Sequence, residues 1–316
     1  MKHWQANLML LFAGAVWGMG FVAQATAMDS IGPFLFIALR FLVASLVVLP
    51  FAIREAGVQI TSGNQEDSVH TCSGRALLTV SHWLKFSLIG LCLFAGMATQ
   101  QVGLLSTSVT NSGFLTGLYV VFTPILSVVL FRQLPHTVTW FAAGLSFLGV
   151  FFLSGGNLVH LTTGDYLTIL SALFWGLQVV LIGRYVAQTD RPLALSLTQF
   201  VITGFLAFVV ALIFEPIVWS AIREAWVEVL YAGMFASGLA FTLQVIGQRY
   251  TSAPKAAIML SSEAPFAALF AYLWLGERLI PIGFLGCLFI LMAMLLVELV
   301  PLWLGRRSTQ TVRVDR

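Results

Sequence analysis

Runs of about 20 apolar residues follow one another along almost the whole chain. At about 1.5 Å of rise per residue, a helix of that length crosses the ~30 Å hydrocarbon layer of a bilayer. Only 9% of the 316 residues are charged, against about 25% in an average soluble domain. An all-α membrane protein is therefore predicted. Hydropathy places ten transmembrane helices at about residues 6–26, 33–53, 84–104, 110–132, 137–154, 165–186, 193–214, 227–248, 255–275 and 280–300.

The basic residues between these spans are distributed unevenly. With the N-terminus inside, thirteen lysines and arginines fall on the cytoplasmic side and two, Arg223 and Arg278, on the other. Because basic loops stay in the cytoplasm, both termini are predicted to be cytoplasmic. The connections are short except for a polar loop at residues 54–83, on which we expect no chemistry. We interpret the first span as a membrane helix and not a cleaved signal peptide, because it is long for one and carries a motif that recurs later.

The two halves of the chain repeat each other. AGAVWG around Trp17 is matched by SALFWG around Trp175, 158 positions later, and LRF at Arg40 is matched by TQF at Gln199, 159 positions later. Each half holds five spans, and an odd number makes the second half enter the membrane in the opposite orientation. The expected fold is ten transmembrane helices in two inverted five-helix repeats. The domains are placed at residues 1–157 and 158–302, followed by a basic cytoplasmic tail at 303–316.

Two matched spans each contain a proline. An offset of 141 aligns residues 110–135 with the stretch 251–277 and places Pro124 on Pro265. Proline removes an intrahelical hydrogen bond, so both helices are expected to bend about one turn earlier, and the two prolines are hinge candidates. Glu263 lies two residues before Pro265. A carboxylate in a spanning helix costs ~2.5 kcal/mol or more on insertion scales, so it normally faces a protein interior or a water-filled cavity.

These motifs together resemble the EamA family of the drug/metabolite transporter superfamily. The resemblance rests on the Trp-Gly pairs, LRF at Arg40, and SEAPF followed by LGER around Glu263, and it extends from about Leu8 to Val300. It implies a bundle of two inverted repeats in the bacterial inner membrane that exports or takes up amino acids and other small metabolites. The chain departs from the pattern at residues 132–135, where RQLP replaces LGER, and in the long polar loop. The family does not fix the substrate.

Polar and aromatic side chains within the spans are the candidate substrate-binding groups. Arg40 and Glu263 are the deepest charges, and either they line a cavity and meet a zwitterionic or charged substrate, or they lock helices as a static ion pair. The aromatic rings can form a substrate wall or pack against other helices, and Gly14xxxGly18 and Gly113xxxGly117 favour packing. The complete set of candidates is Trp17, Arg40, Asn111, Tyr119, Trp175, Gln178, Gln199, Gln244 and Glu263.

The sequence gives little support to catalysis. The five histidines lie outside the spans or at their ends, no GxxxxGK[ST] motif occurs, and the three cysteines show no CxxC spacing. We therefore predict no catalytic residue, no metal site and no cofactor. Transport then draws on a gradient or runs downhill. Coupling to protons or another ion is left open, with Glu263 as the one carboxylate deep enough to carry a proton.

The predicted function is that of a secondary transporter of small organic metabolites, amino acids or related compounds, working in the export direction by alternating access. A lipid or polyprenyl-phosphate flippase of the same architecture is one alternative, and a non-transporting receptor or scaffold is another. The expected partners are a small-molecule substrate and the lipid bilayer, not nucleic acid. A monomer and a homodimer are both compatible with the sequence.

Overall fold

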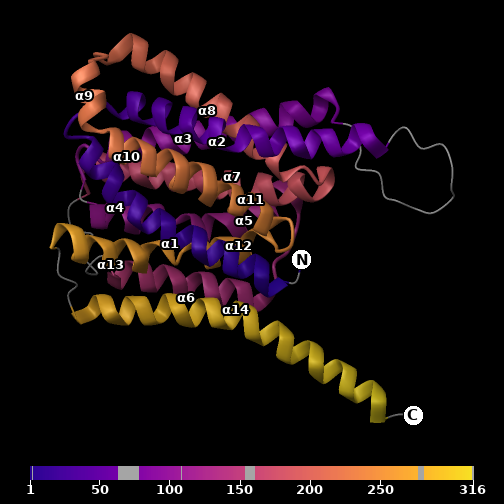
Figure 1. Cartoon of the computed structure of the whole chain (residues 1–316). Coiled ribbons are helices and arrows are strands. Elements are labelled where there is room, and N and C mark those ends of the chain that lie inside the picture. Colours follow the sequence, from indigo (N-terminus) through magenta and orange to yellow (C-terminus); the bar gives the residue numbers. More distant parts are fainter. Residues whose placement is uncertain (2, 63–77, 108, 154–160, 277–280, 315–316) are drawn as a thin grey trace.

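The structure is a computed structural model that describes residues 1, 3–62, 78–107, 109–153, 161–276 and 281–314. The helices lie side by side along a common direction, with both chain termini at the same end of the bundle (Figure 1). In the first half these are α1 (His3–Ala27), α2 (Pro33–Ser62), α3 (Val80–Gly103), α4 (Val109–Thr116), α5 (Tyr119–Phe131) and α6 (Thr137–Leu153). In the second half they are α7 (Thr163–Thr189), α8 (Pro192–Phe214), α9 (Trp219–Glu224), α10 (Trp226–Tyr231), the π-helix η1 (Ala232–Leu239), α11 (Ala240–Gln248), α12 (Ala253–Leu260), α13 (Glu263–Leu275) and α14 (Pro281–Val314).

The prediction of an all-helical membrane protein is confirmed. Within the described ranges, nine helical stretches are long and apolar enough to cross a membrane, and α6 is a tenth apolar helix of 17 residues. Three of the predicted spans are built from consecutive shorter helices: α4 with α5, α10 with η1 and α11, and α12 with α13. Interruptions of this kind are tolerated at membrane depth where they are buried in protein or line a cavity.

Three features differ from the sequence prediction. The polar loop expected from residue 54 begins later, because α2 continues to Ser62; residues 63–77 lie outside the described part. The tail expected at 303–316 is helical as far as Val314. Hydropathy marks where lipid ends, whereas good helix formers carry a helix on into water. The span predicted at 227–248 contains η1, whose wider turns hydropathy does not register.

Helices α2 and α8 form an antiparallel pair that joins the two halves, and a carboxylate near the C-terminal end of each helix caps the N-terminus of the other. Glu215, just after α8, accepts hydrogen bonds from the backbone N–H groups of Phe34 (2.8 Å) and Leu35 (2.7 Å) at the start of α2. Glu55, near the end of α2, accepts from Leu193 N (3.3 Å) and Ala194 N (2.9 Å) at the start of α8. An anion at a helix N-terminus satisfies free amides and complements the helix dipole.

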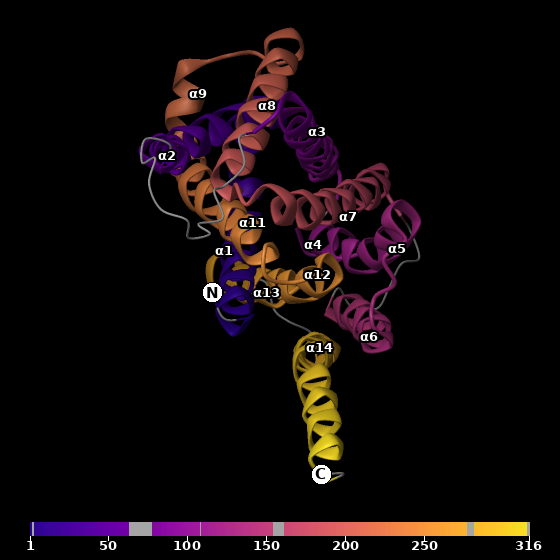
Figure 2. The same cartoon turned by 90° about the vertical axis from the view of Figure 1, so that its right-hand side faces the viewer.

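The α6–α14 pair joins the halves at the opposite side of the bundle (Figure 2). A Cβ atom added to Gly149 would lie 2.7 Å from the carbonyl oxygen of Gly286, and one added to Gly286 would lie 2.4 Å from that of Gly149. Only glycine allows two backbones to approach this closely. The remaining spans lie between the α2–α8 and α6–α14 pairs, so the site is built in the middle of the bundle.

Candidate functional site

A cavity lies at the centre of the bundle's cross-section, between helices of both halves. Its free volume is about 490 Å³, counting crevices and space open to the outside. The lining comes from α1, α2, α3, the α4–α5 and α12–α13 spans, α7, η1 and α11. The lining residues are Trp17, Gly20, Phe21, Gln24, Arg40, Met97, Gln100, Thr116, Tyr119, Trp175, Val179, Ala236, Phe241, Gln244, Leu260 and Glu263.

The two proline-containing spans are each broken where they meet this cavity. The residues on either side of each break line it: Thr116 and Tyr119 in one span, Leu260 and Glu263 in the other. In the second half the break falls at Ser261 and Ser262, close to the position expected from Pro265. In the first half it falls at 117–118, slightly earlier than Pro124 alone implies. The hinge roles of the prolines stay predictions, but both helices are interrupted.

Glycines on α1 allow this helix to pack closely against the break between α12 and α13. A Cβ atom at Gly14 would lie 2.3 Å from the Ser262 hydroxyl oxygen, and one at Gly18 would lie 2.7 Å from Ala267 N. The packing predicted for Gly14xxxGly18 is therefore confirmed. The same prediction for the second motif fits Gly117, whose added Cβ would lie 3.0 Å from Val150, but is wrong for Gly113, whose added Cβ would meet nothing within 4 Å.

Arg40 is buried, with 2% of its surface exposed, and makes no ion pair with another described residue. Its Nε donates to the Ser237 hydroxyl at 2.9 Å, and its Nη1 donates to Gln24 Oε1 at 3.0 Å. The guanidinium carbon also lies 5.4 Å from the centre of the Phe41 ring. The static Arg40–Glu263 ion pair, one of the two alternatives considered from the sequence, is therefore not formed in this structure. Neutral partners hold the guanidinium in position, and no described residue supplies a counter-charge in direct contact with it.

Several buried polar atoms in the cavity have no hydrogen-bond partner among the described residues. They are Glu263 Oε1, the Tyr119 hydroxyl, Trp175 Nε1 and Gln244 Oε1. The Tyr119 hydroxyl and the Glu263 carboxylate lie close enough to interact, but not in hydrogen-bonding geometry. Because a buried unsatisfied polar group costs about 1–3 kcal/mol, a cluster of them needs an explanation. Donors and acceptors facing one space are typical of a ligand site.

Aromatic rings form one side of the cavity. Phe241 stacks on Trp175, with ring centres 5.7 Å apart and planes 12° apart, and it lies 4.6 Å from Trp17. The Trp17 indole N–H donates to the Ala236 carbonyl in η1 at 2.8 Å, which fixes that ring in place. An organic ligand would thus meet an apolar surface beside the two charges.

Three buried glutamines form a chain behind the cavity wall. Gln244 Nε2 donates to Gln178 Oε1, and Gln178 Nε2 donates to Gln199 Oε1, both at 3.2 Å. Only Gln244 reaches the cavity. Gln178 and Gln199, predicted as binding residues, instead lie behind it and orient Gln244.

The structure brings together six of the nine predicted binding residues, namely Trp17, Arg40, Tyr119, Trp175, Gln244 and Glu263. The side chain of Asn111 falls outside the described part of the chain. Sequence reasoning missed Phe21, Gln24, Met97, Thr116, Phe241 and the Arg40 partner Ser237. Gln24 carried a usable signal, since it is a glutamine within a span, whereas an apolar lining residue such as Phe241 looks like any lipid-facing one.

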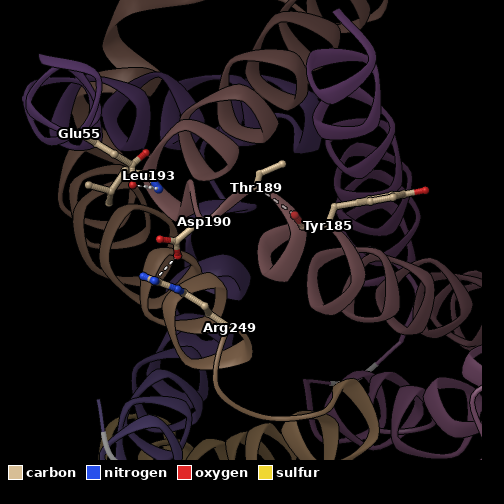
Figure 3. A network of polar contacts seen from close by, with 6 residues as sticks. All are labelled: Glu55, Tyr185, Thr189, Asp190, Leu193 and Arg249. Atoms are coloured by element: carbon tan, nitrogen blue, oxygen red, sulfur yellow. Dashed lines mark hydrogen bonds and ion pairs between the residues drawn. The ribbon is translucent and has the colours of Figure 1, made fainter. Parts of the chain in front are cut away.

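Polar contacts join helices at the end of the bundle that holds the N-terminus. Arg249 forms an ion pair with Asp190 at the end of α7, close to the Glu55 cap of α8 (Figure 3). Lys255 forms an ion pair with Glu298, whose carboxylate also accepts from Asn7 Nδ2 at 2.7 Å. These contacts connect α1, α12 and α14, and separately α7 and α11. The cavity lies nearer the opposite end of the bundle, since α1 lines it only from Trp17 onward.

Comparison with known proteins gives a consistent result. The EamA-like transporter family matches residues 4–155 and 162–299. An uncharacterized transporter from Archaeoglobus fulgidus is 31% identical over 301 residues, covering 94% of this chain and 87% of its own, and the uncharacterized transporter YwfM of Bacillus subtilis is 24% identical over 311 residues, covering 93% and 94%. One solved crystal structure superposes with a TM-score of 0.73 at 18% identity, covering 97% of this chain and 99% of its own, which shows a shared fold. The chain therefore belongs to the EamA-like transporter family.

Proposed function

We propose that this transporter carries small zwitterionic metabolites, amino acids or close relatives, and binds them in the central cavity. The observation that supports this is the pair of opposite charges at Arg40 and Glu263, which face one cavity without pairing with each other. A ligand carboxylate supplies the counter-charge that Arg40 lacks, and a ligand ammonium group donates to Glu263 Oε1. Each charge-assisted hydrogen bond is worth about 1.5–3 kcal/mol.

The aromatic side of the cavity favours an apolar side chain on the substrate. Trp17, Trp175 and Phe241 offer ring faces and edges, while Trp175 Nε1 and Gln244 Oε1 remain free for one donor and one acceptor contact. Small hydroxylated side chains would leave these rings uncovered. The site therefore suits amino acids whose side chains are apolar and of medium to large size.

Alternating access follows from the position of the cavity between two oppositely oriented halves. With both termini in the cytoplasm, the ion pairs of Arg249 with Asp190 and of Lys255 with Glu298 lie on the cytoplasmic side. The structure then represents a state closed toward the cytoplasm. Opening that side separates α12 from α14 and α7 from α11, with the broken spans at Pro124 and Pro265 bending to allow it. Export across the bacterial inner membrane is the direction we expect.

Matched ligands test the zwitterion site directly. Purified protein is heated with leucine or phenylalanine, with their amides, which lack the carboxylate, and with their N-acetyl forms, which lack the ammonium group. A ligand that binds only the folded state raises the melting temperature, so the parent amino acids should stabilise the protein and both analogues should do so at least about tenfold more weakly, because each lacks one charged contact.

Two variants test which charged group of the ligand each side chain binds. Arg40→Gln should abolish the preference for the free acid over the amide, and Glu263→Gln the preference for the free amine over the N-acetyl form. Flux of labelled amino acid into reconstituted vesicles should fall in both. Equal stabilisation by the parent compounds and both analogues would contradict the site.

A further inference from the structure

A second hollow, separate from the central cavity, lies on the surface of the α2–α8 pair. It is an elongated groove formed by α2 from Ala38 to Ser45 and by α8 from Phe200 to Phe208. Its free volume is about 780 Å³, part of it open to the surroundings. Seven residues of helix measure about 10 Å, so the groove follows both helices for about that length.

The groove opens toward the lipid. Both α2 and α8 are candidate membrane spans, and the groove lies within them, away from their ends. The side chains at its rim are exposed: Leu42 by 56%, Val201 by 50% and Phe205 by 63%. At this depth a bilayer supplies hydrocarbon and no water.

The lining offers nothing to a polar occupant. Its one hydroxyl, on Ser45, already donates to the Phe41 carbonyl at 2.8 Å, and every other lining side chain is apolar or glycine. An unfilled hollow of this shape would forfeit dispersion contacts along its whole length. The occupant that fits an apolar lining within membrane spans is a hydrocarbon chain.

The floor of the groove is also the back wall of the central cavity. The Phe41 and Phe200 rings line the groove, lie 5.7 Å apart, and are each 6.2 Å from Phe241, which lines the cavity. The Arg40 guanidinium lies directly behind Phe41, 5.4 Å from its ring centre. One layer of aromatic rings therefore separates the groove from the charged site.

We propose that this groove is a specific binding site for one acyl chain of a bilayer phospholipid. The chain lies along the exposed Leu42, Val201 and Phe205 side chains. It covers the fully buried Phe41 and Phe200 rings, which pack against Phe241 in the aromatic wall beside Arg40. This site does not depend on which solute the central cavity carries.

A phospholipid with a photoreactive diazirine near the middle of one acyl chain tests the proposal. The full-length protein is reconstituted with this lipid, irradiated and digested, and the labelled residues are mapped by mass spectrometry. Labelling of residues 38–45 and 200–208 should exceed that of the exposed face of α6 around Phe141 about tenfold, the enrichment expected from roughly ten additional close heavy-atom contacts in the groove.

Groove-filling variants make the test specific. Val201→Trp and Leu42→Trp place an indole in the groove from opposite walls and should lower labelling to the level of α6. They should also reduce the phospholipid that remains with the protein after detergent purification. Leu212→Trp is the matched control, because Leu212 is also exposed on α8 (57%) but does not line the groove, and it should change neither result. Uniform labelling of all lipid-facing helices, or labelling unaffected by either groove variant, would overturn the proposal.

Discussion

The cap that Glu215 forms on α2 should depend on the glycine beside it. A Cβ atom added to Gly32 would lie 2.4 Å from the Glu215 carboxyl carbon and 2.4 Å from its Oε2, and the three atoms nearest to it all belong to Glu215. The substitution Gly32→Ala would therefore push the carboxylate off the amides of Phe34 and Leu35. The backbone adds no conformational strain to this substitution, because the φ angle of Gly32 is not positive.

The magnitudes follow from these contacts. Two charge-assisted hydrogen bonds at a half-exposed helix start are worth about 2–3 kcal/mol together once water can replace them. Glu215→Ala should lower the free energy of unfolding by that amount, and Gly32→Ala by about 2 kcal/mol. In the double variant the added methyl group has nothing to displace. Replacing glycine gives a small entropic gain, but alanine is a poor N-cap, and the two effects offset each other. In the Glu215→Ala background, Gly32→Ala should therefore change the free energy of unfolding by no more than about 0.5 kcal/mol.

A double-mutant cycle measures this coupling. The free energy of unfolding is determined for the parent, both single variants and the double variant by reversible unfolding in mixed micelles. The expected interaction energy is about 2 kcal/mol, well above the ~0.3–0.5 kcal/mol seen for independent sites. Gly144→Ala is the control, since a Cβ atom there would meet nothing within 4 Å, and it should be neutral or stabilising by up to about 1 kcal/mol. If the costs of Gly32→Ala and Glu215→Ala simply add, the cap is not what Gly32 accommodates.

Three further substitutions address the broken helices and the cavity. Gly18→Ala should destabilise the protein by about 1–3 kcal/mol, because its methyl group meets the backbone of α13; an unchanged unfolding transition would contradict that packing. Trp175→Phe removes an unsatisfied indole N–H but keeps the stack on Phe241; it should stabilise the empty protein by up to about 1 kcal/mol and weaken amino-acid binding, and unaltered affinity in a thermal-shift titration would exclude the indole as a ligand donor. Pro265→Ala should raise the melting temperature and slow vesicle flux, because it allows α12 and α13 to become continuous; flux at the parental rate would remove the hinge role.

The costs of burying charge and of interrupting a helix explain how much of the site was predictable. A guanidinium at Arg40 and a carboxylate at Glu263 are too costly in lipid to be incidental, so their positions in the sequence already indicated an interior polar space. Pro265 marked a helix break in the same way. Both physical arguments are local to a single span, and the structure places Arg40 and Glu263 on one cavity.

The features that were not predictable depend on how helices pack against each other. Arg40 binds Ser237 and Gln24 instead of Glu263. Which partner it meets depends on how α1, α2 and η1 are rotated about their axes. The sequence does not determine this rotation, because these helices are apolar on every face. The same ambiguity placed Gln178 and Gln199 in the cavity when they lie behind it. The length of α14 was not predictable for another reason: hydropathy marks only the apolar stretch, and the helix continues beyond it.

The α2–α8 contact has the self-complementary character of an isologous dimer interface. Each half contributes both a carboxylate and the amides that receive the other carboxylate, so Glu55 and Glu215 exchange roles when the halves are interchanged. A five-span unit could form the same two contacts with an upside-down copy of itself. Covalent linkage between the halves is therefore not needed to specify this junction, and two separately synthesised halves should carry enough information to recognise each other there.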